Sequence, residues 1–309
     1  MTANILLTTS KVLTLDLDNP QTEKFIPACR LKWRKKILWV TKVSDDFKPI
    51  PALTRQQWLQ DCLNNSWVKT VCLDYSLEEK AIRVWADTCR KAKKKVFLRI
   101  NSSYQILNRY TQVCWQIKRI FDWVSAAILL LLLSPLMLAI AFLVKLSSPG
   151  KILFRQWRVG KRGQLFQIYK FRTMKVDAEQ QHHQVMGDLD GLHKLEKDPR
   201  ITPLGKWLRK YSLDELPQLF NVLRGEMSLV GPRPWALYDA LRLREADKKR
   251  LNALPGITGA WQVKSRSQLL DLNAVTKCDL EYLHSWSLIG DLKILMLTIP
   301  KVISGFGAY

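Results

Sequence analysis

The sequence predicts a membrane-associated α/β (α+β) protein with three parts: a small soluble domain (residues 1–115), a re-entrant membrane helix hairpin (117–149) and a larger cytosolic domain (150–309). Three observations predict this organisation. Strand and helix patterns alternate in the first part. The second part contains 22 consecutive residues without a charge, and the third mixes short strand patterns with helical ones.

The composition favours a folded protein with an anionic partner. Hydrophobic residues make up 47% of the 309 residues, and 49 basic against 27 acidic residues give a net charge of +22. The excess is spread along the chain, which excludes a basic tail and leaves nucleic acid, anionic lipid or a phosphorylated substrate as partners. The six cysteines form no C-x-x-C pair. We expect reduced, mostly buried thiols in a protein that faces the cytosol.

The first part reads as a small α/β domain. Between Val68 and Ile100 the order strand, helix, strand predicts a βαβ unit. No Gly-x-Gly-x-x-Gly motif follows the strand patterns, so a dinucleotide site is not expected. The expected strands are Ile5–Leu17, Ile37–Val43, Val68–Leu73 and Val96–Ile100, and the expected helices are Thr54–Asn64 and Leu77–Lys94.

The uncharged segment from Trp123 to Val144 is long enough for a bilayer, because 22 helical residues extend about 33 Å. Ser134-Pro135 stands near its middle, where proline removes a hydrogen bond and kinks a helix. Both flanks are basic, so neither end prefers the outer side of the membrane. A hairpin broken at Pro135, which enters and leaves on one side, is preferred to a simple span. The alternative is a kinked crossing helix.

The third part alternates short strands, turns and helices. Gly160–Gly163 is expected to close a hairpin. The polar stretch 177–200 carries His182, His183 and His193 but no further ligand for zinc, so it is interpreted as a loop. The expected strands are Ile152–Phe154, Leu165–Tyr169 and Met227–Val230, and the expected helical segments are Leu204–Leu223 with one break, Ala236–Asn252, Leu272–Ser285 and Leu292–Ile303.

Two adjacent acids, Asp214 and Glu215, lie in the segment Ser212–Gln218. One interpretation is structural: Ser212 and Glu215 have the spacing of a capping box at a helix start. The other is chemical. The helix dipole would keep Asp214 ionised, and an ionised carboxylate can act as a nucleophile while its neighbour holds a metal ion.

Several basic residues stand in settings suited to phosphate. Gly231-Pro232 and Pro234 fix the backbone around Arg233, and rigidly held arginines suit phosphate oxygens. A membrane segment, held arginines and a carboxylate nucleophile together predict chemistry on phosphate at a membrane surface. The candidate substrate-binding residues are Lys170, Arg172, Arg209, Arg233 and Arg266.

From about Ile117 to Tyr309 the sequence resembles the bacterial sugar transferases, which are monotopic polyprenyl-phosphate phosphoglycosyl transferases. The matches occur in order over about 190 residues. Many relatives have Gly before the arginine at position 266, where this chain has Ser265. The matching segments are Lys118–Asp122, Ser134-Pro135, Tyr169–Met174, Ser212–Asn221, Met227–Pro234, Pro255–Gly259 with Trp261–Val263, and Asp291–Lys293 with Gly307–Tyr309.

The resemblance implies a function and assigns residues. It implies a re-entrant hairpin around Ser134 and Pro135, with Asp214 as the nucleophile and Glu215 as the neighbouring acid that helps to hold Mg²⁺. It places Arg209 near the substrate phosphates, together with Arg233. The family moves a sugar 1-phosphate from a UDP-sugar to polyprenyl phosphate through a phosphosugar–aspartyl intermediate and releases UMP.

The expected location is the inner membrane, with the catalytic domain on its cytoplasmic face, in exopolysaccharide, capsule or other glycoconjugate assembly. The expected partners are the UDP-sugar, polyprenyl phosphate and membrane lipids. A non-catalytic membrane-surface scaffold is the alternative, and the intact Asp214–Glu215 pair argues against it. No nucleic acid is expected, because no reading helix or RNA-binding signature occurs. The sugar, the oligomeric state and the role of residues 1–115 are not predicted.

Overall fold

The structure is a computed structural model of the whole chain, and it describes residues 29–42, 56–99, 109–176, 178, 198–242, 244, 247–264 and 272–305. The chain divides into two compact units, Met1–Arg99 and Ile100–Tyr309. The expected strand Ile5–Leu17 lies outside the described residues. All six cysteines are free thiols, as predicted, but only Cys89 is buried.

The first unit is a four-stranded sheet in the order β1-β2-β3-β4, with β1 antiparallel to β2 and the other pairs parallel. Its core combines inward-facing strand residues such as Val40 and Val71 with Leu59 of α1 and Trp85 of α2. The elements are β1 (Cys29–Arg34), β2 (Ile37–Lys42), α1 (Gln56–Asn65), β3 (Thr70–Leu73), α2 (Glu79–Lys91) and β4 (Lys95–Leu98).

The βαβ unit is confirmed, because β3 and β4 are parallel neighbours joined by α2. The other two expected elements within the described range, β2 and α1, also form. Strand β1 was not predicted. It is an edge strand whose outer positions Arg30, Lys32 and Arg34 are exposed, so it lacks the apolar alternation that marks a strand.

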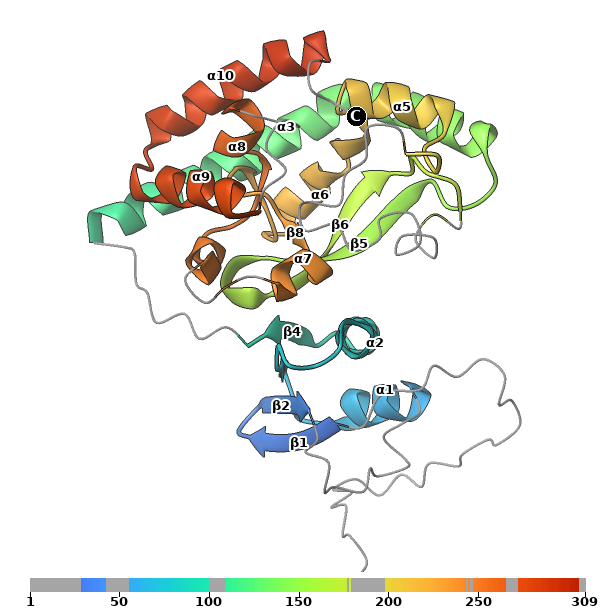
Figure 1. The fold of residues 1–309 in the computed structure, drawn as a ribbon, viewed down its shortest axis with the longest axis vertical. Coiled ribbons are helices and arrows are strands. Elements are labelled where there is room, and N and C mark those ends of the chain that lie inside the picture. Colours follow the sequence, from blue (N-terminus) through green and yellow to red (C-terminus); the bar gives the residue numbers. More distant parts are fainter. Residues whose placement is uncertain are drawn as a thin grey trace, which may run out of the picture. The chain divides into compact units, whose positions relative to one another are not determined.

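The second unit contains a three-stranded antiparallel sheet in the order β6-β5-β8 and a parallel pair β7-β9, surrounded by helices (Figure 1). Its first elements are α3 (Arg109–Ser147), β5 (Leu153–Val159), η2 (Lys161–Gly163), β6 (Leu165–Phe171), α5 (Pro203–Lys210), η3 (Leu213–Glu215) and α6 (Gln218–Leu223). The others are β7 (Ser228–Val230), β8 (Trp235–Ala236), α7 (Leu237–Leu241), η4 (Asp247–Asn252), β9 (Gly256–Thr258), α8 (Ala260–Lys264), α9 (Leu272–His284) and α10 (Leu288–Ser304).

Most predicted elements of this unit form, including the β5–β6 hairpin closed at Gly160–Gly163. Two helical predictions were wrong in detail. The expected helix Ala236–Asn252 is a short helix, α7, followed by the 3-10 turn η4. The expected helix Leu204–Leu223 is divided into α5, η3 and α6, because Ser212 adopts a left-handed backbone that no helix continues.

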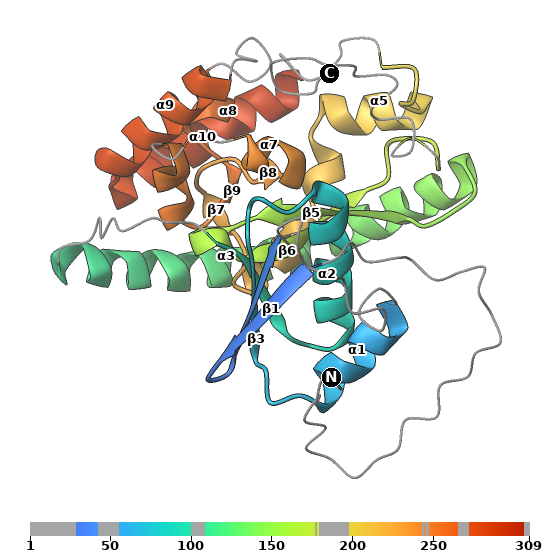
Figure 2. The same ribbon diagram turned by 60° about the horizontal axis from the view of Figure 1, so that its bottom comes forward.

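Helix α3 packs on the second unit at two places along its length. Near its middle, Ala126 joins the main apolar cluster with Phe166 of β6 and Leu219 of α6. Near its end, Ile140 packs in a second cluster that includes Leu208 of α5. Figure 2 shows the first half of α3 (teal) on the side of α9 and α10 and its last turns (light green) on the side of α5. The helix therefore lies along this unit rather than projecting away from it.

Helix α3 is also the described helix that is long and apolar enough to cross a membrane, by length and composition. The sequence predicts two half-helices around Ser134-Pro135, whereas the structure has one helix that continues through Pro135. Proline removes only its own N–H donor, and neighbouring turns retain their hydrogen bonds. The Ser134 hydroxyl donates to the Leu131 carbonyl oxygen at 2.8 Å.

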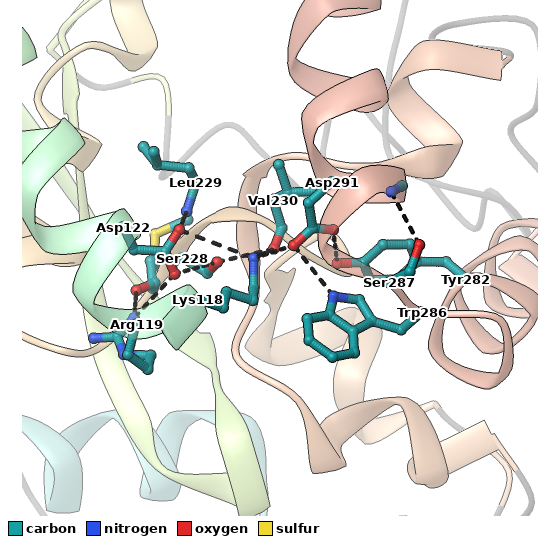
Figure 3. A network of polar contacts seen from close by, with 12 residues as sticks. Lys118, Arg119, Asp122, Ser228, Leu229, Val230, Tyr282, Trp286, Ser287 and Asp291 are labelled. Atoms are coloured by element: carbon teal, nitrogen blue, oxygen red, sulfur yellow. Dashed lines mark hydrogen bonds and ion pairs between the residues drawn. The ribbon is translucent and has the colours of Figure 1, made fainter. Parts of the chain in front are cut away.

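The topology prediction takes the basic flank before the apolar segment to face solvent on the cytoplasmic side. In the structure, Lys118 of this flank is buried. Its side chain is 3% exposed, and its Nζ lies 2.6 Å from Asp291 Oδ2 of α10 and 3.0 Å from the Val230 carbonyl oxygen (Figure 3). Arg119 donates to the Met227 carbonyl oxygen. These cations therefore fasten α3 to β7 and α10 instead of marking the cytoplasmic side.

Candidate active site

A cavity of about 1530 Å³ lies in the second unit, and it extends from the adjacent acids to the apolar helix α3. Asp214 and Glu215 line it together with side chains of β5, β6 and α5. Ser134 and Met137 of α3 line it as well. Four of the five predicted substrate-binding residues, Lys170, Arg172, Arg209 and Arg233, also lie on its wall. Arg266 lies outside the described residues.

Helix α5 brings Arg209 to the cavity through a close contact with the chain after β6. The hydroxyl of Thr202 caps this helix by accepting from the Gly205 N–H at 3.0 Å. A Cβ at position 205 would lie 2.0 Å from the Thr173 carbonyl oxygen, so only glycine permits this approach. Arg209 then donates from Nε to the Thr173 hydroxyl at 2.9 Å.

A left-handed turn at Ser212 directs the two acids into the cavity. Its φ is +52°, and its side chain makes no capping hydrogen bond, so the predicted capping box is wrong. Asp214 and Glu215 lie in the 3-10 turn η3 that follows. A left-handed conformation at a residue other than glycine costs about 1–3 kcal/mol, which is typical of functional positions.

Lys170 of β6 is the counter-ion of both acids. Its Nζ lies 2.6 Å from Glu215 Oε1 and 4.0 Å from Asp214 Oδ2. Within the described part of the chain, Lys170 is the one ion-pair partner of Asp214. The predicted constellation of these three residues is therefore present as a compact cluster.

The carboxyl group of Asp214 has its pKa raised to about 6. Burial is the main cause, and the negative charge of Glu215 acts in the same direction; Lys170 and Arg209 oppose the shift. The sequence leads to the expectation that a helix dipole keeps this carboxylate ionised, whereas burial in the structure opposes the ionised form. Asp214 is ionised at neutral pH but only weakly stabilised in that form, which suits a nucleophile.

Arginines form the wall that contains β5 and the Pro232–Pro234 loop. The Arg233 guanidinium lies over the Trp261 ring at 5.0 Å. Arg158 of β5 was not predicted, yet it lines the cavity and donates to the Pro234 carbonyl oxygen at 3.1 Å. Its buried Nε has no hydrogen-bond partner among the residues that the structure describes. A lone arginine within a strand pattern carries no sequence signal for a site, so only the fold reveals it.

Arg172, on the cavity wall, also makes a structural contact through one of its nitrogens. Its Nη2 donates to the Ser148 carbonyl oxygen at 2.7 Å, the Ser148 hydroxyl at 2.8 Å and the Val144 carbonyl oxygen at 3.2 Å. It therefore fastens the end of α3 to β6 at the cavity edge. A second arginine there, Arg200, forms a buried ion pair with Asp198 at 2.6 Å.

The acids can supply part of a magnesium site. Among the residues that the structure describes, no three His, Cys, Asp or Glu side chains converge on one point. Mg²⁺ in phosphate chemistry is commonly held by one or two carboxylates, with phosphate and water oxygens as the other ligands. Glu215 and Asp214 fit that donor set. The histidines considered for zinc lie outside the described residues.

The comparison with known families agrees with this site. The model of the bacterial sugar transferase family matches residues 113–305, which include α3 from its second turn onward and the whole described cavity wall. The chain therefore belongs to the bacterial sugar transferase family. The first unit lies outside the match.

Individual relatives agree on the class and differ in the sugar that their names give. The chain is 46% identical over 165 residues to the galactosyl transferase CpsE of Streptococcus agalactiae, covering 52% of this chain and 36% of that protein. It is 43% identical to the exopolysaccharide production protein ExoY of Rhizobium meliloti, covering 62% and 88%. It is 42% identical to the UDP-glucose:undecaprenyl-phosphate glucose-1-phosphate transferase of Escherichia coli, covering 62% and 41%. The chain thus spans less than half of two of these relatives and most of the third.

Proposed function

We propose that the protein transfers a sugar 1-phosphate from a UDP-sugar to polyprenyl phosphate, with undecaprenyl phosphate as the acceptor. The observation that carries this proposal is the buried Asp214 carboxylate in a cavity lined by arginines and by the membrane helix. The names of relatives support it, since one of them transfers glucose 1-phosphate to undecaprenyl phosphate.

In the first step, an Asp214 carboxylate oxygen attacks the phosphorus atom that bears the sugar. A new O–P bond forms, the bond from phosphorus to the bridging oxygen of the diphosphate breaks, and UMP leaves with the electron pair. Arg209 and Arg233 on the cavity wall are positioned to offset the negative charge of the diphosphate. Lys170 neutralises the acid pair before the donor arrives.

In the second step, a phosphate oxygen of the lipid attacks the same phosphorus and Asp214 is released as the leaving group. The acceptor would approach from the side of α3, because Leu130, Ser134, Met137 and Leu138 continue the cavity wall toward the apolar helix. Donor and acceptor then use one phosphorus in turn and need not be bound together.

Glu215, with Asp214, is proposed to hold Mg²⁺ against the phosphates. When bound, the ion supplies positive charge that neutralises the diphosphate and the leaving nucleotide. Lys170 lies 2.6 Å from Glu215 and compensates its charge when no substrate is present. Replacing Glu215 by Gln is expected to weaken the metal dependence of turnover.

The chain is proposed to be monotopic, with the continuous helix α3 embedded in the cytoplasmic face of the inner membrane without crossing it. Both halves of α3 pack on the same unit, so a crossing orientation would separate contacts that this structure makes together. Apolar side chains remain exposed between them, including Leu131 (76%) and Leu138 (72%). Helix α10 adds an exposed apolar row, with Ile289, Leu292, Met296 and Ile303.

The function is tested with purified protein, UDP-sugars labelled in the sugar and undecaprenyl phosphate. We expect label in the organic phase only when the lipid is present, together with release of UMP. A panel of UDP-glucose, UDP-galactose and their N-acetylated forms identifies the sugar. Labelled lipid that appears without UMP, or no lipid-dependent product with any donor, contradicts the proposal.

Topology is tested separately by labelling single cysteines in intact cells, with Leu131 and residues at both ends of α3 as sites. The monotopic arrangement predicts that Trp115 and Ser148 positions are reached only from the cytoplasmic side. Labelling of one end from the periplasm would show that the helix crosses the membrane.

A further inference from the structure

A buried ion pair behind the cavity joins two elements that carry none of the predicted site residues. Arg250 belongs to η4 and Asp279 to α9, and each is about 1% exposed. Arg250 donates from Nε to Asp279 Oδ2 at 3.1 Å, and its Nη2 donates to the same oxygen. The guanidinium lies over the ring of Trp235 at 4.2 Å, which fixes its plane.

The Arg250–Asp279 pair also contacts the backbone of one cavity residue, Arg233. Arg250 Nη2 donates to the Arg233 carbonyl oxygen at 2.8 Å. The Arg233 backbone N–H lies close enough to the Asp279 carboxyl to lower its pKa, against the larger effect of burial, which raises it. The backbone of a single residue therefore meets both members of one ion pair. The prolines on either side, Pro232 and Pro234, restrict the remaining backbone freedom.

The side chain of Arg233 starts from this fixed backbone and lies over Trp261. A buried ion pair contributes little net stability, because desolvation offsets its attraction, and apolar replacements are often as stable. A pair that only joined η4 to α9 would not need hydrogen bonds to the loop. The hydrogen bond from Arg250 to the Arg233 carbonyl oxygen, with Asp279 close to the Arg233 N–H, instead suits a demand for accurate placement of the Arg233 guanidinium.

We propose that Arg250 and Asp279 are positioning residues, which hold Arg233 at the angle needed to meet the phosphate groups of the nucleotide-sugar donor. This inference rests on the proposed function, because it takes Arg233 to bind that diphosphate. Neither positioning residue is expected to touch the substrate. Displacement of a group by about 1 Å can reduce a rate about 100-fold. Loss of the contacts that Arg250 and Asp279 make with the Arg233 backbone should therefore slow the reaction strongly, although neither residue touches the substrate.

The test is a double-mutant cycle on the rate of UMP release in a single turnover with the UDP-sugar alone. Arg250→Lys keeps the charge but loses the guanidinium, which can donate several hydrogen bonds in fixed directions. We expect the rate of UMP release to fall about 10–100-fold. Arg233→Ala is expected to lower it at least as much. In the Arg233→Ala background, Arg250→Lys should then cause no further loss, because the residue that it positions is absent.

Arg244→Lys is the matched control, because Arg244 lies close before η4 and its exposed side chain pairs with Asp247. Its release rate should equal that of the unmodified protein. Asp279→Asn keeps the shape and one acceptor oxygen for the Arg233 N–H. It replaces Arg250→Lys in the cycle if that variant does not fold, as judged by thermal melting.

The outcomes separate this inference from the proposed function. No UMP release by the unmodified protein contradicts the function. Release that is normal in Arg233→Ala, or losses that multiply in the double variant, overturns the positioning role and leaves the function standing. A loss confined to Arg233 and its two partners, with no effect of Arg244→Lys, supports the positioning role.

Discussion

Two clusters in the second unit have the same composition and nearly the same distances. Lys118 lies 2.6 Å from Asp291 and 3.9 Å from Asp122. Lys170 lies 2.6 Å from Glu215 and 4.0 Å from Asp214. Each cluster thus consists of one lysine and two carboxylates. The first links α3 to α10, and the second is the candidate catalytic centre.

The clusters differ in what else their carboxylates bind. Asp122 accepts from the Ser228 hydroxyl at 2.7 Å and the Leu229 N–H at 3.1 Å (Figure 3). Asp291 accepts from the Tyr282 hydroxyl at 2.7 Å, so both carboxylates have several donors.

Asp214 has Lys170 at 4.0 Å and faces a cavity. Carboxylates that are saturated with donors hold elements together, whereas a buried carboxylate with unused lone pairs can react.

Replacing the nucleophile should produce the largest difference in activity between the two clusters. Asp214→Asn is expected to lower turnover about 10⁴-fold or more, because an amide oxygen cannot form the intermediate. Asp122→Asn, the matched change in the other cluster, should reduce the melting temperature. It leaves Asp214 in place, so the attack on the donor phosphorus can still occur. Turnover by lipid extraction and melting by circular dichroism measure the two effects. Comparable activity of Asp214→Asn and the unmodified protein would remove Asp214 from the mechanism.

Removing each lysine should separate stability from activity. Lys118→Met leaves two buried carboxylates without their cation and is expected to cost about 3–5 kcal/mol of unfolding free energy. Lys170 is 19% exposed and borders a cavity, so Lys170→Met should fold while its UMP release slows. Thermal melting and single-turnover release are compared for both variants. Equal melting temperatures for the two would show that the clusters do not differ as described.

The rate of UMP release should depend on pH through the carboxyl group of Asp214, whose pKa is raised to about 6. Below that pH the carboxyl is protonated and cannot attack, so at pH 5 the rate should be about a tenth of its plateau. Circular dichroism at each pH confirms that the protein remains folded. A rate that stays at its plateau down to pH 5 would contradict the raised pKa.

Asp214 should also lower stability at neutral pH. Its pKa is higher in the folded protein than the ordinary value of 3.8, so the folded state binds the proton more tightly than the unfolded state. Stability therefore falls as the pH rises from about 4 to about 6. At pH 7.5 Asp214→Asn is expected to unfold at a higher temperature, with a gain of at most about 3 kcal/mol that disappears near pH 4. A lower melting temperature at pH 7.5 would contradict this.

The sequence predicts elements best where a periodic apolar pattern is strong. The βαβ unit and helices α9 and α10 show such patterns, whereas the basic edge strand β1 does not. Charge patterns were less reliable. Lys118 reads as a membrane flank, but a contact 173 residues away in sequence takes it into the core. Pairings at that separation leave no local signal.

At the site, the sequence identified Asp214, Glu215, Lys170, Arg209 and Arg233, and all five line one cavity. Arg172, also predicted, lines the same cavity. The sequence did not identify how these residues are supported. The left-handed turn at Ser212, the unpredicted wall residue Arg158 and the hydrogen bonds from Arg172 to the end of α3 all depend on tertiary contacts. The motif therefore indicates the chemistry, while the positions of the groups come from packing.

The most direct test of the account is the reaction of the protein with UDP-sugar in the absence of any lipid acceptor. If Asp214 is the nucleophile, the protein should release about one UMP per active site. Its mass should increase by one sugar phosphate, and the modified peptide should contain Asp214. Addition of polyprenyl phosphate should remove the added mass, and initial rates should give parallel double-reciprocal lines. No UMP before the lipid is added, together with intersecting lines, would instead show direct transfer with both substrates bound and would contradict the covalent role of Asp214.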